Sequence, residues 1–216
     1  MIPYADMTGL ASDAIAIAVA AVMLPGVAGI AQPYRIALAA LVAAVLLIPL
    51  GNLPPAAYLR GAIGDLSITS QLLLLMAILR PMYVWPLSGE LHAPSPSGGG
   101  LGWGNEGGKY TLLSLIALAA LGLYPMALGI GSFDPYRLGY GDPWFLGSLL
   151  VISVLAYFRR LWLPVCVIVL AVLAWTAGWY ESTNLWDYLL DPLLAVYAIG
   201  VLLRQGARIL SGNHQT

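Results

Sequence analysis

Charged residues are scarce in this sequence. Of its 216 residues, nine are Lys or Arg and ten are Asp or Glu, so only 9% are charged while 60% are apolar. Soluble domains carry about 25% charged residues. This scarcity excludes an ordinary soluble globular domain and a disordered chain. The net charge of −1 lacks the basic excess that nucleic-acid binding requires, so we expect no nucleic-acid partner.

Cysteine and histidine are nearly absent as well. The single cysteine, Cys166, excludes an internal disulfide and any multi-cysteine metal site. The two histidines, His92 and His214, lie in polar segments, which excludes a bis-histidine membrane haem and a histidine proton relay. We therefore expect neither a cofactor nor a metal ion.

Long apolar runs are abundant, and a transmembrane helix needs about 20 such residues. We predict an all-α membrane bundle, a single transmembrane domain over residues 1–216 with about seven transmembrane helices. The predicted spans are Leu10–Ala31, Ile36–Leu50, Ala62–Leu79, Tyr110–Ile130, Pro143–Phe158, Leu161–Gly178 and Leu185–Leu203. Residues 88–109 are rich in Gly, Pro and Ser, which predicts a flexible loop there.

The basic residues predict the orientation of the bundle. With the Arg159-Arg160 link in the cytoplasm, seven spans place the N-terminus outside, the C-terminus inside and loop 88–109 in the cytoplasm. Inside segments then hold seven basic residues and outside segments only Arg60 and Arg137, as the positive-inside rule expects. We predict a bacterial-type cytoplasmic (inner) membrane. Eight of the ten acidic residues fall at or near the outer face.

Polar residues of this outer face form the candidate functional cluster. If residues 62–79 form one helix, Arg60, Gly64, Ser67 and Gln71 share one stripe, which should face the bundle interior because polar groups are costly in lipid. The full candidate cluster is Arg60, Asp65, Gln71, Asp134, Arg137, Glu181, Asn184, Asp187 and Asp191.

Structural roles explain several of these residues equally well. Asp142 before Pro143 is typical of a helix N-cap. Asn184 with Asp187 resembles a capping box. Asp191 lies two turns into the last span if that helix starts near Asn184, but it is only another cap if the helix starts at Pro192. The two outer arginines can simply be counter-charges to outer carboxylates.

Three functions remain open. The absence of a recognisable catalytic arrangement favours a non-catalytic accessory or scaffold subunit of a cell-envelope system. Its partners would be membrane lipids and other membrane or envelope proteins. The first alternative is a small proton- or cation-coupled carrier that uses Asp65, Asp187 and Asp191. The second is an enzyme that holds a lipid-linked phosphate with Arg60 and Arg137.

Overall fold

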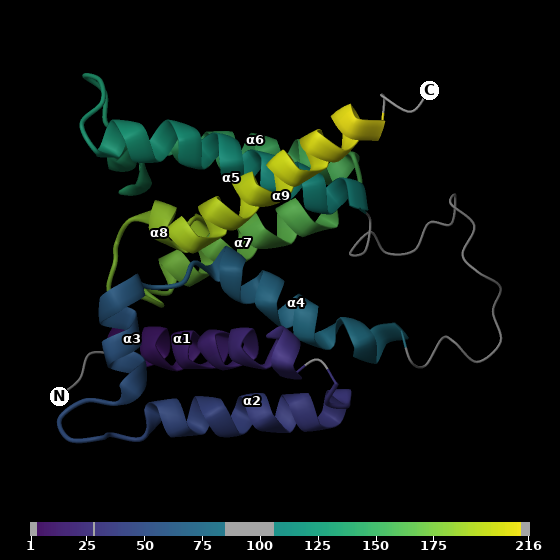
Figure 1. The fold of residues 1–216 in the computed structure, drawn as a ribbon. Helices are drawn as coiled ribbons and strands as arrows, with labels where there is room; N and C mark the ends of the chain where they lie inside the picture. Colours follow the sequence, from purple (N-terminus) through teal and green to yellow (C-terminus); the bar gives the residue numbers. More distant parts are fainter. Residues whose placement is uncertain (1–3, 28, 85–105, 213–216) are drawn as a thin grey trace. The chain divides into compact units, whose positions relative to one another are not determined.

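The structure, a computed structural model, describes residues 4–27, 29–84 and 106–212 (Figure 1). Every regular element in these residues is a helix, and the only β pairing among them is an isolated bridge between Leu50 and Leu53. The all-α prediction is therefore confirmed. The chain divides into two compact units, Met1–Gly98 with Ala174–Ser182 and Gly99–Leu173 with Thr183–Thr216, called unit 1 and unit 2 below.

Unit 1 is built around the contact of its first two long helices with a third. Its elements are α1 (Tyr4–Val22), η1 (Pro25–Val27), α2 (Gln32–Leu47), α3 (Pro55–Ile63) and α4 (Ile68–Val84). Figure 1 shows α1 and α2 side by side, and both also contact α4. Val19, Val22, Ala39 and Ile78 form the buried core where these helices meet. The small Ala39 and Ala43 side chains leave room for close packing of α2.

Unit 2 contains the remaining elements. They are α5 (Glu106–Ala127), η4 (Pro135–Gly139), α6 (Pro143–Phe158), α7 (Trp162–Thr176), whose last residues belong to unit 1, α8 (Leu185–Leu189) and α9 (Pro192–Gly212). The longest helices, α5 and α9, pack on each other (Figure 1). The short elements η4 and α8 contact each other, and η4 also contacts α5 and α6, so η4 ties one end of this unit together.

Three of the predicted spans are interrupted. In Leu10–Ala31 the helix α1 ends at Val22 and is followed by η1. The single helix predicted over Ala62–Leu79 was wrong, because the chain breaks between α3 and α4 at Gly64, whose φ of +78° favours glycine. The sequence left open whether Leu185–Leu203 is one helix or two. This segment is split into α8 and α9, since Asp191 caps α9 and Pro192 stands at its first position.

Other boundaries differ by a few residues, among them the start of α5. Glu106 to Lys109, predicted as the end of the flexible loop, form the first turn of α5. The rest of that loop, residues 88–105, lies outside the described residues. The link at Arg159 and Arg160 is a tight turn as expected, with Arg160 at a φ of +56°.

One helix in the described residues, Gly108–Ala127, is long and apolar enough to cross a membrane. Five further apolar helices are shorter: Gln32–Leu47, Ile68–Leu79, Pro143–Phe158, Trp162–Thr176 and Pro192–Ala207. At 1.5 Å per residue, a 16-residue helix such as α6 measures about 24 Å, whereas a bilayer core is about 30 Å thick. The described helices therefore do not establish seven spans.

Candidate functional site

The most concentrated group of charges in unit 1 surrounds one arginine. Arg60, near the end of α3, forms ion pairs with Asp6 and Asp13 of α1, with Asp65 of the α3–α4 link and with Glu181. We call these five residues the Arg60 cluster. Both carboxylate oxygens of Asp65 accept hydrogen bonds from Arg60, one from Nε and one from Nη2 at 3.1 Å. Arg60 is therefore a counter-charge to an outer carboxylate, one of the roles that the sequence left open for it.

The cluster forms because α3 ends where it does. The turn at Gly64 folds the chain back, so Asp65 reaches Arg60 although only five residues separate them. Gly9 of α1 gives the guanidinium its space, since a Cβ there would lie 3.1 Å from Arg60 Nη2. The predicted stripe of Arg60, Gly64, Ser67 and Gln71 on one helix was wrong because of this break. Arg60 and Gln71 instead both approach α1 from separate helices.

Asp13 is the most buried member of the cluster. Its side chain is only 1% exposed, compared with 18% for Asp65, 32% for Asp6 and 56% for Glu181. Its Oδ1 accepts hydrogen bonds from the backbone N–H of Leu66 and from Gln71 Nε2, both at 3.2 Å. Its Oδ2 has no hydrogen-bond partner among the described residues and lies 3.8 Å from Arg60 Nε.

A polar shell closes over this carboxyl group. Gln71 Nε2 contacts four acceptors, namely Asp13 Oδ1, Ser12 Oγ, the Leu66 carbonyl and, at 2.8 Å, the Tyr180 hydroxyl. Tyr180, itself buried, donates its hydroxyl proton to the Leu66 carbonyl at 2.6 Å. Trp179 Nε1 donates to Ser12 Oγ at 3.3 Å. Segment 174–182 is therefore held against α1 and the α3–α4 link through side chains.

The charges of the Arg60 cluster alter one another's titration. The hydrogen bond to Asp65 raises the pKa of Arg60 above its usual value, and the neighbouring carboxylates act in the same direction. Arg60 is therefore a permanent cation. A hydrogen bond with Asp6 raises the pKa of Glu181, and the negative charges nearby add to this. Carboxyl groups in this cluster thus interact directly with one another as well as with Arg60.

In unit 2, the predicted residues gather around η4. The Tyr136 hydroxyl lies 2.9 Å and 3.0 Å from the two carboxylate oxygens of Asp187 and donates to that group. Asn184 Nδ2 donates to the Tyr136 carbonyl at 2.9 Å, so η4 and α8 are linked by polar contacts. Burial, followed by the hydrogen bond to Asp187, raises the pKa of Tyr136. The phenol therefore stays protonated, and this contribution is lost only in strong alkali, above the ordinary tyrosine range.

The other carboxylates of this unit act as helix caps. Asp134 accepts from Tyr136 N, Asp142 accepts from Trp144 N and Phe145 N, and Asp191 accepts from Leu194 N at 2.8 Å. Asn184 caps α8 through Trp186 N at 3.0 Å. The prediction that Asp142 and Asn184 are caps is confirmed. Of the two roles open to Asp191, the structure forms the cap.

This role sets the expected effect of changing Asp191. Asparagine caps a helix as well as aspartate does, so Asp191→Asn should cost about 1 kcal/mol or less, whereas Asp191→Ala should cost about 1–2 kcal/mol. The free energy of unfolding of the detergent-solubilised protein measures both. If the two variants are equally unstable, the charge of Asp191 matters more than its cap.

The candidate residues do not form one described site. Arg60, Asp65, Gln71 and Glu181 belong to unit 1, whereas the other five belong to unit 2. Arg137 is exposed and has no ion pair within the described parts of the chain, so its predicted role as a counter-charge is not seen there. Searching those residues for three or more His, Cys, Asp or Glu side chains able to hold a metal ion finds no such group.

Sequence reasoning left Asp6 and Asp13 of the Arg60 cluster outside the candidate site. It also left out the neighbouring Gly9, Ser12 and Tyr180, although Gly9 lies directly against Arg60. A signal was present, because Asp6, Gly9 and Asp13 have the spacing of one helical face. An aspartate inside the predicted span Leu10–Ala31 also requires a partner.

The comparisons with known proteins give no family for this chain. No protein-family profile, curated protein or solved structure matches it. Its function must therefore be argued from the two polar arrangements described above.

Proposed function

We propose that the protein is a multi-pass membrane protein with a non-catalytic accessory or scaffold role in a cell-envelope system. We place it in a bacterial-type inner membrane, where it acts through the acidic residues of its outer face. One observation carries this proposal: all the candidate polar side chains except Arg137 are engaged in caps, ion pairs or other hydrogen bonds, while the helices expose apolar side chains.

The exposed surface supports a lipid environment. On α6, Trp144, Leu150 and Phe158 are 86%, 65% and 75% exposed, and on α9 Val196 is 72% exposed. Soluble monomers rarely expose contiguous apolar patches of more than a few hundred Å². In a bilayer, the same side chains are in their preferred solvent, and the shorter helices can be accommodated by local thinning of the bilayer.

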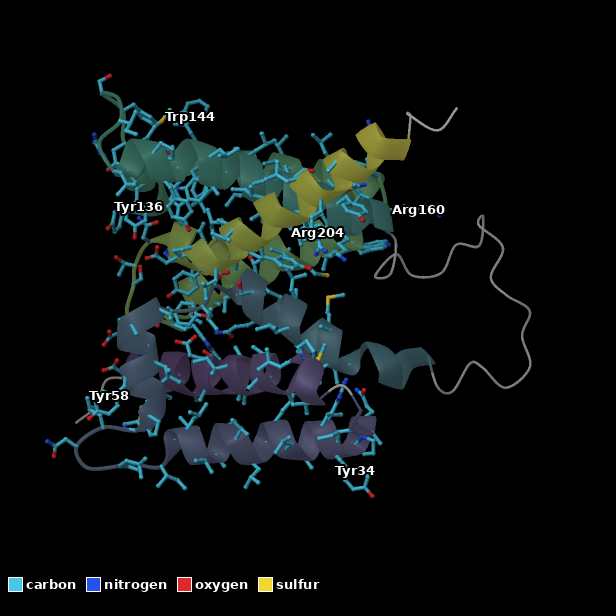
Figure 2. All side chains as sticks on the ribbon, viewed as in Figure 1. Tyr34, Tyr58, Tyr136, Trp144, Arg160 and Arg204 are labelled. Atoms are coloured by element: carbon cyan, nitrogen blue, oxygen red, sulfur yellow. The ribbon has the colours of Figure 1, made fainter. Side chains whose placement is uncertain are left out.

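The distribution of residues along unit 2 supports the predicted orientation. Figure 2 shows Tyr136 and Trp144 at one end of this unit and Arg160 at the other, with Arg204 between them but nearer to Arg160. The capping carboxylates lie with Tyr136 and Trp144, because they cap η4 and α6. Aromatic residues favour the membrane boundary and arginines favour the cytoplasmic side, so the first end would face outward.

The alternative functions have less support. An enzyme that binds a lipid-linked phosphate needs arginine donors directed at the ligand, but those of Arg60 are directed at Asp6 and Asp65. A carrier that uses Asp191 needs a carboxylate free to exchange ions, but Asp191 caps α9. Because Arg60 and Asp191 stabilise the fold, binding a partner protein is the simplest role of the outer face.

The experiment is partner retention by charge-neutral variants. The double variant Asp134→Asn, Asp142→Asn removes two outer charges and keeps both caps, because asparagine is an equally good N-cap. We expect the tagged protein, purified in mild detergent from its source cells, to carry a stoichiometric partner that the double variant loses. The control is Arg204→Gln, which removes an exposed charge nearer to the other end of unit 2 and should retain the partner.

Two results would contradict the proposal. The first is a wild-type protein that purifies as a single species without a partner. The second concerns topology: in a Cys166→Ala background, cysteines placed at Arg137 and Arg159 should react with membrane-impermeant reagent from opposite sides. Labelling of both from the same side would disprove the multi-pass orientation.

A further inference from the structure

The Arg60 cluster contains more carboxyl groups than its one cation can neutralise. Four carboxyl groups face a single guanidinium, and the strongest donors of Arg60 are taken by Asp65 and Asp6. Asp13 receives none of these hydrogen bonds, although its Oδ2 lies within ion-pair distance at 3.8 Å. A buried carboxylate oxygen without a donor is costly, because burial removes its water without replacing it.

The two oxygens of Asp13 have different surroundings. Oδ1 accepts from two N–H donors, those of Leu66 and Gln71, as a carbonyl oxygen does. Oδ2 accepts from none of the described residues, and the carboxyl group of Asp65 pairs with the same Arg60 Nε. An ionised carboxylate has no hydrogen to donate to Oδ2, whereas a protonated Oδ2 can donate to a carboxylate. This asymmetry is that of a neutral carboxylic acid with its O–H at Oδ2.

We propose that Asp13 is a proton-binding site, which takes up a proton from solvent through the more exposed carboxyl groups of the Arg60 cluster and holds it on Oδ2 toward Asp65. The step is an acid–base equilibrium, in which hydronium gives its proton to the carboxylate and leaves water. This inference does not depend on the accessory role proposed above.

The four carboxyl groups form a route for the proton from solvent to Asp13, as their exposed fractions indicate. Glu181 and Asp6 are 56% and 32% exposed and interact with each other, Asp65 is 18% exposed, and Asp13 is 1% exposed. All four contact Arg60, so a proton that passes from one to the next stays beside the same cation. Exposure falls stepwise from solvent to the buried oxygen, as a short relay requires.

The neighbouring elements add no competing cation. The titratable groups around Asp13 are Arg60 from α3, which pairs with it, and the groups that contact Arg60 or Gln71 in turn: Asp6 from α1, Asp65 from the α3–α4 link, and Tyr180 and Glu181 from segment 174–182. From α4 it faces the amide of Gln71, which does not titrate. Arg35 of α2, which also packs on α1, is hydrogen-bonded to the Val27 carbonyl instead.

A proton suits this site better than a metal ion. In residues 4–27, 29–84 and 106–212 no three acidic, histidine or cysteine side chains are arranged to bind a metal. Arg60 Nε already occupies the position near Oδ2 that a cation would need. A proton needs only the oxygen itself and the acceptor opposite it.

The test is infrared spectroscopy of the full-length protein in lipid nanodiscs, with the aspartate carboxyl carbons labelled with 13C. Between about pH 5 and about pH 9, we expect the C=O band of a protonated aspartate that disappears as the pH rises. Asp13→Asn should abolish this band. The variant should fold, because the amide accepts from Leu66 and Gln71 through Oδ1 and donates through Nδ2 in place of the O–H.

Asp134→Asn is the matched control, since Asp134 lies outside the Arg60 cluster and asparagine keeps its cap on η4. It should keep the band. If the wild type shows no protonated aspartate across this range, or if the band survives Asp13→Asn, the proposal is overturned. Should Asp13→Asn fail to fold, 13C NMR of the labelled wild type decides, because one of its seven aspartates should resonate as a neutral acid near neutrality. Seven ionised aspartates would refute it.

Discussion

Replacing Arg60 by alanine is expected to destabilise the protein by about 3–5 kcal/mol, the cost of removing one partner from a buried ion pair. Arg60 has a side chain only 14% exposed, and its loss leaves the Asp65 carboxylate, which is 18% exposed, without its guanidinium partner. Denaturant titration of the solubilised protein measures this change, and Trp179 next to the cluster provides a fluorescence signal.

The matched control for this prediction is Arg137→Ala. Arg137 also lies at the end of a short helical element, but it is exposed and has no ion pair within the described chain, so its removal should change stability by less than about 0.5 kcal/mol. Arg60→Lys should fall between the two, since an ammonium keeps the charge but loses the two-point contact with Asp65. Equal stability of Arg60→Ala and Arg137→Ala would show that the Arg60 cluster contributes nothing to the fold.

The double variant Arg60→Met, Asp65→Asn separates charge from packing. If the penalty comes from the uncompensated Asp65 carboxylate, neutralising Asp65 should recover a large part of the stability lost in Arg60→Met. If the penalty comes from lost packing of the arginine stem against α1, the double variant should be no better than the single one. The non-additivity of the two changes measures the interaction directly.

Local chemistry allowed much of this fold to be predicted. The capping pair Asp142-Pro143 fixed the start of α6, and the predicted span Pro143–Phe158 coincides with this helix. The tight link at Arg160 was likewise readable, since two arginines separate two apolar runs. In both places a strong local signal stands at the helix end, and no tertiary contact has to override it.

Two of the interrupted spans show where this reasoning fails. Apolar residues lie on both sides of Gly64 and of Asp191, so a search for apolar runs joins the segments across each break. The first break depends on Gly64, which has a positive φ, and the second on Asp191, which caps α9. Each break is therefore caused by a single residue, which a search for apolar runs does not detect. Asp13 was missed as a site residue for a related reason. Its role depends on Arg60 and Asp65, which reach it only because the chain turns at Gly64.

Gly139→Ala should be the most damaging small substitution in unit 2. Gly139 is buried at the end of η4, and a Cβ there would lie 2.6 Å from Asn184 Cγ, closer still to Asn184 Oδ1, and 2.7 Å from Trp186 Cδ1. Distances under 3.0 Å cannot be tolerated, so Asn184 and Trp186 must move. Gly139 is not among the described glycines with positive φ, so the expected effect is steric only.

The displaced side chains hold this end of the unit together. Asn184 caps α8 and donates to the Tyr136 carbonyl, while Trp186 donates to the Pro135 carbonyl at 3.0 Å and lies 4.4 Å from the Phe145 ring. Losing the cap costs about 1–2 kcal/mol, and overpacking costs a further 1–3 kcal/mol, so we expect a loss of about 2–5 kcal/mol.

Gly147→Ala is the control for this prediction. Gly147 lies inside α6, and a Cβ there would meet nothing within 4 Å, so alanine should be neutral or stabilise the helix by up to about 1 kcal/mol. We therefore expect the same glycine-to-alanine change to lower the stability of the protein at Gly139 and to leave it unchanged or raise it at Gly147. Thermal unfolding in one detergent compares them directly. If Gly139→Ala unfolds at or above the wild-type temperature, α8 does not pack on η4 through Asn184, and the grouping of Tyr136, Asn184 and Asp187 must be abandoned.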